Sequence, residues 1–187
     1  QFGGKAGHQI RAVLAAMATP NWGMYAGYEL VEAVARPGAE EHIDSEKFQY
    51  KPRDWKAEEA AGKSLAPFIT RLNKIRNENA ALQQLRNMEI QGSDDSNILC
   101  FSKHMDAQYT PDGKPSTVIV VVNLDPHNVR EGDIHLDLWK LGISYDEPFK
   151  VTDLMTGDSR HISAKSYVRI DPFIEPALVL LVDRDKK

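Results

Sequence analysis

The spacing of apolar residues divides the chain into two parts that meet near residue 84. In residues 7–18, the apolar positions are Ile10, Val13, Leu14 and Met17. In residues 65–82, they are Leu65, Phe68, Ile69, Leu72 and Ile75. Steps of three and four residues place such side chains on one face of an amphipathic helix. We therefore predict two helices. The first ends before Pro20, and the second begins near Ser64 with Pro67 in its first turn.

The segment between the two helices, "NWGMYAGYELVE", is short, aromatic and interrupted by Gly23 and Gly27. Glycine in such a run marks a place where another backbone approaches closely. We therefore predict a buried strand at residues 22–25 and an exit loop from Gly27 onwards. Residues 36–55 mix acids, bases and aromatics without any apolar period, which indicates a loop.

After about residue 86 the apolar residues occur in short runs or alternate with polar ones. Segments of this kind are residues 97–104, 116–124, 133–138, 148–157, 166–173 and 176–184. Pro, Gly, Asp and Asn separate them, and "PDGK" at 111–114 is typical of a hairpin. Short strands that follow one another without helices predict an antiparallel β-sandwich.

Composition and charge narrow the choice of partners. The chain has 187 residues and a formal net charge of −4, so it lacks the basic surface that nucleic acids or anionic membranes select. No apolar run approaches the length of a membrane span. The single cysteine, Cys100, excludes an internal disulfide, and its apolar neighbours indicate a buried thiol. The chain opens on Gln and enters a helix within about ten residues, which we interpret as a piece of a longer protein.

Several segments resemble a known enzyme family. "WGMYAGYE", with a helix before it and a long loop and helix after it, resembles the eighth barrel strand of alpha-amylase superfamily enzymes. "YELVEAVARPGAEEHIDSEKFQYKPRDW", "RLNKIRNENAALQQL", "VVVNLDPH" and "SYVRIDP" are similar to the C-terminal third of bacterial alpha-1,4-glucan:maltose-1-phosphate maltosyltransferases. The similarity extends over essentially the whole chain. It implies an α+β fragment, in which residues 1–84 end a catalytic (β/α)8 barrel and residues 85–187 form an all-β sandwich.

The resemblance also implies an activity for the parent protein. Enzymes of this family transfer maltosyl units from maltose 1-phosphate to the end of an α-1,4-glucan with retention and release phosphate. The two carboxyl groups that a retaining mechanism needs lie, in this family, on barrel strands that precede residue 1. The resemblance therefore assigns no catalytic residue to this chain and implies that the chain alone is inactive. It further implies a cytoplasmic, homodimeric bacterial parent without cofactor, metal site, nucleic-acid partner or membrane partner.

The candidate binding residues lie in the loop of residues 28–63. Barrel enzymes build their sites from loops at the carboxyl ends of the strands, so this loop would face the sugar-binding cleft. Within "SEKFQ", the resemblance implies that Lys47 contacts donor-sugar hydroxyls, for which an ammonium offers three donors. Phe48 stands where the family has Tyr, so its ring can cover a sugar face but cannot make a hydroxyl hydrogen bond. The alternatives are a surface lysine paired with Glu46 and a phenylalanine that anchors the loop.

Other residues in the loop have structural interpretations. The resemblance implies that Glu29 holds the loop or an arginine, and we expect "PRDW" at 52–55 to fold the loop back through an Arg–Asp contact. The acids and histidine of "EEHID" at 40–44 have no zinc-site spacing and too few regular oxygens for a hard cation. We therefore predict no metal site. In the β region, Tyr109, Trp139 and Tyr167 are candidates for glucan binding, but we expect Trp139 to fill the core.

Two other functions stay open from the sequence. The chain could belong to a glucan hydrolase or transglycosylase of the same superfamily. These enzymes differ in what accepts the glycosyl group, which is water or a glucan hydroxyl. It could also be a non-catalytic carbohydrate-binding module, although such a module has no need of a helix–strand–loop–helix unit. In either case the apolar face of the 65–82 helix must pack against another surface, because an exposed apolar face promotes association. We predict that the N-terminal half either self-associates or packs onto the β region.

Overall fold

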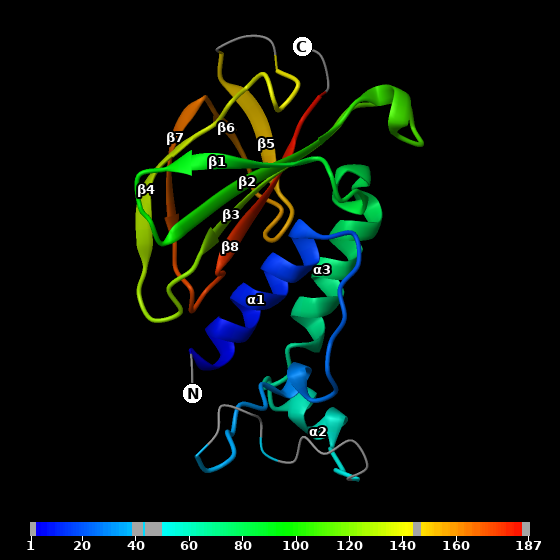
Figure 1. Ribbon diagram of the computed structural model, residues 1–187, viewed down its shortest axis with the longest axis vertical. Coiled ribbons are helices and arrows are strands. Elements are labelled where there is room, and N and C mark those ends of the chain that lie inside the picture. The colour runs from blue at the N-terminus through cyan, green and yellow to red at the C-terminus, as the bar shows by residue number, and fades with distance from the viewer. Residues whose placement is uncertain (1–2, 39–42, 44–49, 144–146, 185–187) are drawn as a thin grey trace.

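The computed structural model describes residues 3–38, 43, 50–143 and 147–184, and it contains one antiparallel sheet with helices on one face (Figure 1). The α-helices are α1 (Gly4–Ala18), α2 (Trp55–Ala60) and α3 (Ala66–Glu78), and the 3-10 turns are η1 (Tyr28–Leu30), η2 (Ala80–Gln83) and η3 (Ala107–Tyr109). The strands are β1 (Met88–Ser93), β2 (Ile98–Met105), β3 (Ser116–Asn123), β4 (Arg130–His135), β5 (Phe149–Asp153), β6 (Ser159–Ile162), β7 (Lys165–Ile170) and β8 (Ala177–Val182).

The sheet has the strand order β6-β5-β8-β3-β2-β1-β4-β7, and every pairing in it is antiparallel. Strand β3 lies near its middle, and each of its residues from Thr117 to Asn123 is buried. Successive side chains of a strand point to opposite faces, so burial of every residue means that both faces are covered.

The two faces of β3 belong to two different cores. Val118, Val120 and Val122 join a cluster that also contains residues of α1 and α3. Ile119 and Val121 join a second cluster with residues of β4, β5, β6, β7 and β8. Strands from both ends of the sheet therefore share one core, which requires that the sheet curls around it. The helices cover the other face.

The long helices pack against each other and against the sheet. Figure 1 shows α1 and α3 side by side below the strands. Met17 of α1, Leu72 of α3 and Phe101 of β2 are at most 1% exposed and lie in one cluster. Arg71 of α3 adds polar contacts, donating to the carbonyl oxygen of Met155 at 2.6 Å and to Oε2 of Glu175 at 3.0 Å. This confirms the prediction that the N-terminal half packs onto the β region.

Two cationic side chains hold the C-terminal end of α1. Lys103 of β2 is fully buried, and its Nζ donates to the carbonyl oxygen of Ala18 at 3.3 Å and to that of Gln84. Arg76 of α3 donates to the carbonyl oxygens of the two residues that follow α1. These donors occupy carbonyls that a helix end leaves without partners. Burial, together with the nearby Arg76 charge, lowers the pKa of Lys103 to about 8.

The predicted end of a (β/α)8 barrel is wrong. Residues 21–25 form no strand, and Gly23, Met24 and Tyr25 are exposed. The Trp22 indole nitrogen donates instead to Oδ1 of Asn73 on α3 at 3.1 Å. A strand needs a neighbouring strand for its backbone groups, and no strand of the described ranges pairs with this segment. The predicted antiparallel β domain does fit, and its strands form one eight-stranded sheet that curls around a core like that of a sandwich.

Candidate substrate-binding loop

The described residues of the loop 28–63, namely 28–38, 43 and 50–63, lie at the end of the molecule away from the sheet, around α2 (Figure 1). A backbone hydrogen bond joins its two ends, because the amide of Leu65 donates to the carbonyl oxygen of Glu29 at 2.7 Å. Within the loop, the amide of Ile43 donates to the carbonyl oxygen of Val34 at 2.8 Å. The loop therefore leaves and rejoins the fold at one point.

An ion cluster fastens the same base from within. The Glu32 carboxylate accepts from Arg53 through two bonds, Nε to Oε1 at 2.7 Å and Nη2 to Oε2 at 3.0 Å. Lys51 adds a third contact, with Nζ 3.2 Å from Oε2. A bidentate guanidinium–carboxylate pair fixes geometry as well as charge. The bonds from Arg53 outweigh burial and, with Lys51, lower the pKa of Glu32 to about 2.

The backbone at this base adopts an uncommon conformation. Gly27 has φ of +99°, and a Cβ there would lie 2.7 Å from Cδ of Glu32 and 3.0 Å from Nη2 of Arg53. Val31 has φ of +56°, the only non-glycine positive φ among the described residues. Positive φ is unusual for a β-branched residue and marks a backbone that its surroundings hold in place. The Glu32 and Arg53 side chains therefore pack directly against the backbone of Gly27.

Further contacts order helix α2 within the loop and connect the loop to helix α1. Asp54 caps α2, since its Oδ1 accepts from the amide of Ala57 at 3.0 Å. The Arg53 guanidinium lies 5.8 Å from the centroid of the Trp55 ring, within cation–π range. On the other side, the Tyr28 hydroxyl donates to the carbonyl oxygen of His8 in α1. The N-terminal end of the loop is thus bonded to α1, which positions that end relative to the core.

Acid is expected to release this ion cluster. The folded-state pKa of Glu32 is depressed, so its contribution to stability is complete above its ordinary value of 4.5 and is lost as pH falls towards about 2. An NMR titration of the Arg53 Nε–H signal should therefore show its midpoint near pH 2. In Glu32→Gln, which keeps the shape but not the charge, that transition should disappear. A midpoint near 4.5 would show that the pair does not form.

The residues predicted to bind sugar, Lys47 and Phe48, lie outside the described residues, as do Glu46 and most of "EEHID". The flanking residues are described. Glu29 holds the base of the loop, since its Oε2 accepts from the amide of Gly27 at 3.2 Å and its carbonyl oxygen accepts from the amide of Leu65. The arginine partner is Glu32, not Asp54. Glu32 and Arg53 are 21 residues apart, a separation at which no sequence pattern predicts a pair.

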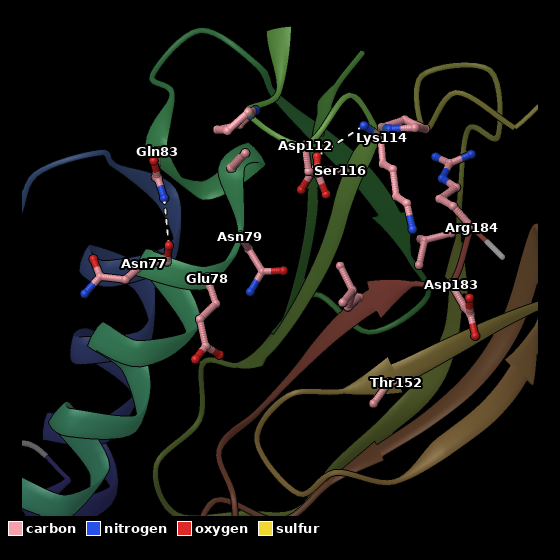
Figure 2. Close-up of a pocket in the computed structure, with 15 residues that line it drawn as sticks. Asn77, Glu78, Asn79, Gln83, Asp112, Lys114, Ser116, Thr152, Asp183 and Arg184 are labelled. Carbon is pink, nitrogen blue, oxygen red and sulfur yellow. Dashed lines mark hydrogen bonds between the residues drawn. The ribbon is translucent and has the colours of Figure 1, made fainter. Parts of the chain in front are cut away.

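A concave region lies between the end of α3 and the sheet (Figure 2). It has a volume of about 550 Å³, and its lining includes Asn77, Glu78, Asp112, Lys114 and Asp183. Two bonds shape it: Gln83 Nε2 to the carbonyl oxygen of Asn77, and the Lys114 amide to Oδ1 of Asp112, both at 3.1 Å. Acids and bases occur together around this hollow, so its charge favours no particular ionic ligand.

Other reactive chemistry is limited in the described part of the chain. Cys100 is 1% exposed, and burial raises the pKa of its thiol to about 12, which makes it a poor nucleophile. Within residues 3–38, 43, 50–143 and 147–184, no three His, Cys, Asp or Glu side chains gather as a metal site would require. The helices of those ranges all fall short of the length and apolar character that crossing a bilayer takes.

The fold is similar to part of a known amylase. A maltogenic alpha-amylase, AmyB from Thermotoga neapolitana, matches with a TM-score of 0.60 and 10% identity, over 95% of this chain and 36% of that one. This similarity defines the class of the fold: helices followed by an antiparallel β domain, as found within an alpha-amylase.

Sequence comparison identifies the family within this class. Residues 90–182 match the family model described as "GLGE, C-terminal". The alpha-1,4-glucan:maltose-1-phosphate maltosyltransferase 1 of Streptomyces coelicolor is 43% identical over 98% of this chain and 26% of its own length. The maltosyltransferase of Bifidobacterium longum is 45% identical over 96% of this chain and 24% of its own length, and that of Corynebacterium glutamicum is 43% identical over 97% and 26%.

The chain belongs to this maltosyltransferase family and corresponds to its C-terminal region. It spans about a quarter of the length of the curated relatives it matches. The resemblance predicted from the sequence is therefore confirmed.

Proposed function

We propose that this chain is the C-terminal part of an enzyme that transfers maltosyl units from maltose 1-phosphate to the non-reducing end of an α-1,4-glucan. In this reaction the bond between C1 and the phosphate oxygen breaks, phosphate leaves, and a glucan 4-hydroxyl takes the maltosyl unit with retention. The observation that carries the proposal is 41–45% identity to five named maltosyltransferases over nearly the whole chain.

The loop of residues 28–63 is proposed to contribute to donor binding. Its base is fixed by the Glu32–Arg53 pair and by the bond from Leu65 to Glu29. A fixed base lowers the conformational entropy that sugar binding would otherwise cost. Lys47 is proposed to donate to donor hydroxyls and Phe48 to cover a sugar face. The catalytic carboxylates are proposed to lie outside these 187 residues, so the chain alone is expected to be inactive.

The proposal includes the surroundings of the parent enzyme. We propose a cytoplasmic homodimer that acts in bacterial α-glucan synthesis and uses neither nucleic acid nor membrane as a partner. The bacterial sources of the named relatives support this setting. Light scattering of the complete protein tests the dimer, and cell fractionation tests the compartment.

One assay separates transferase from hydrolase. The complete protein encoded by the gene is incubated with maltose 1-phosphate, with and without glycogen. A transferase releases phosphate only when glycogen is present, and the glucan grows by two-glucose steps. A hydrolase releases phosphate without glycogen and produces free maltose. Release that is independent of glycogen would contradict the proposed function.

Lys47→Ala in the complete protein is expected to raise the KM for maltose 1-phosphate about tenfold, since a hydrogen bond from a charged donor contributes about 1.5–3 kcal/mol. The matched control is Lys63→Ala, because Lys63 is the last residue of the same loop and its side chain is 69% exposed. Steady-state kinetics at saturating glycogen measure both variants. Equal KM values for Lys47→Ala and the wild type would remove Lys47 from the site.

A further inference from the structure

One large aromatic side chain is exposed on a turn that the structure holds rigidly. Trp139 is 83% exposed, so the prediction that it fills the core is wrong. It lies in the turn after β4, between the buried residues Leu136 and Leu141. An indole has a large apolar area, and leaving it in water forgoes the stabilisation that burial would give. Single exposed apolar side chains are ordinary on protein surfaces, so Trp139 is a candidate only together with the groups that surround it.

The turn is fixed by bonds to its neighbours. Gln91, buried in β1, accepts from the amide of Asp137 at 2.8 Å, and its own amide group donates to Ser102 at 2.8 Å. Lys140 is joined to Glu89 of the same strand at 2.7 Å. The amide of Ile143 donates back to the carbonyl oxygen of Leu138 at 2.8 Å, which closes the turn. The indole is thus presented from a backbone that is already ordered.

A hollow of about 450 Å³ adjoins the ring, within the range of roughly 300–1,000 Å³ that small-ligand sites occupy. Besides Trp139, His104 and Asp106 from the end of β2 line it, as does Gly142. His104 is positioned from both sides, with Nδ1 2.7 Å from Thr117 Oγ1 and Nε2 3.1 Å from Asp106 Oδ1. The Asp106 side chain is 67% exposed, which leaves its carboxylate accessible to a ligand.

This combination of groups fits a neutral, polyhydroxylated ligand. The apolar C–H face of a pyranose ring packs on an aromatic face. A carboxylate accepts hydrogen bonds from adjacent hydroxyls. Both ring nitrogens of His104 are engaged by Thr117 and Asp106, so His104 holds the Asp106 carboxylate in place. The nearby cations do not favour an anion, because Lys140 is paired with Glu89, and Arg184 donates to the carbonyl oxygens of Leu141 and Gly142.

We propose that Trp139, His104 and Asp106 form a second, non-catalytic binding site for an α-1,4-glucan chain. The turn follows β4 and, coloured yellow in Figure 1, lies at the end of the molecule opposite to the loop of residues 28–63. The site therefore holds a distant part of a long glucan and keeps the polymer near the enzyme. The identity of the ligand as an α-glucan rests on the proposed function, whereas the chemistry of the site fits an oligosaccharide independently of it.

The test is native gel electrophoresis of the complete protein in gels that contain a series of glycogen concentrations. Trp139→Ala should raise the apparent Kd for glycogen about tenfold, as expected for the loss of a stacked ring. Trp139→Phe should keep most of the affinity, and Asp106→Asn should weaken it. Phe173→Ala is the matched control, because Phe173 is 71% exposed in the turn after β7. Strands β4 and β7 are paired antiparallel, so this turn and the turn of Trp139 lie at opposite ends of the pair.

Several results would overturn the site. One is that glycogen retards Trp139→Ala as strongly as the wild type. Another is that Phe173→Ala loses as much glycogen affinity as Trp139→Ala. A third is that Trp139→Ala has a lower mass by light scattering while its glycogen affinity is unchanged. Initial rates with maltohexaose as acceptor should be the same in Trp139→Ala and the wild type, and a reduced rate would also contradict the proposal. A protein without transferase activity that still shows Trp139-dependent retardation would refute the proposed function alone and support the site.

Discussion

Replacing Leu72 by alanine is expected to lower the free energy of unfolding by about 3 kcal/mol, within the range of roughly 2–5 kcal/mol for such truncations in a packed core. Leu72 is fully buried and belongs to the cluster that contains Met17 of α1, Phe101 of β2 and Val120 of β3. The cavity would open where helices and sheet meet, so both sides lose contacts. Urea denaturation of the 187-residue chain measures the change.

The same variant tests the predicted division into residues 1–84 and 85–187. If helices and sheet unfold together, amide exchange in α3 and in β3 should accelerate by the same factor in Leu72→Ala. Two independent domains would instead show faster exchange in α3 only, with β3 unchanged. Leu85→Ala is the matched control, because Leu85 is 60% exposed and its truncation should cost no more than about 0.5 kcal/mol.

The second large effect is expected at Lys103 and depends on pH. The pKa of this buried ammonium falls from 10.5 to about 8 in the folded chain. Between these values the unfolded chain binds a proton that the folded chain does not, so stability rises with pH across that interval. The total rise is about 3 kcal/mol, at about 1.4 kcal/mol per pKa unit. Below pH 8 both states are charged and the rise is absent.

Lys103→Met separates this contribution from other titrations. Methionine approximates the stem of lysine but cannot be charged, so the difference in stability between the wild type and the variant should change across pH 8–10.5. Cys100 and Tyr28 also have raised pKa values, but both proteins contain them and their contributions cancel. In the control Lys114→Met, at an exposed position, the free energy of unfolding should depend on pH as it does in the wild type. If the free energy of unfolding depended on pH in the same way in Lys103→Met and the wild type, the pH effect could not come from Lys103.

Much of the β region could be predicted because burial follows the sequence pattern there. The six predicted segments correspond to β2, β3, β4, β5, β7 and β8. Strands β1 and β6 were missed because most of their side chains are exposed, which leaves no apolar alternation to detect. "PDGK" does lie between the paired strands β2 and β3, as predicted.

Tertiary contacts explain the wrong predictions. The "NWGMY" run has the composition of a strand, but in the structure Trp22 bonds to α3 and the segment has no strand beside it. Trp139 directly follows the predicted strand segment 133–138, yet β4 ends at His135 and the chain then turns. A periodic pattern shows which residues prefer burial, but not where an element ends or what lies next to it.

The candidate loop could be located from the sequence, but the contacts that hold its base could not be predicted. The density of charge between residues 36 and 55 indicated a loop, and residues 36–38, 43 and 50–54, the described part of this range before α2, form no helix or strand. The pairing of Glu32 with Arg53 depends on how the chain folds back at Gly27 and Val31. Such positive-φ turns are set by surrounding contacts rather than by residue type, particularly at a valine.

The closed base of the loop affects how changes within the loop are tolerated. Because Glu29 is bonded to Leu65, and Glu32 to Arg53, the residues between them begin and end at one fixed point. The entropy of closing a loop grows only slowly with its length. Insertions, deletions and substitutions in residues 33–50 should therefore leave the rest of the fold almost undisturbed. Changes of length or sequence within this segment are therefore expected to cost far less stability than changes in the core.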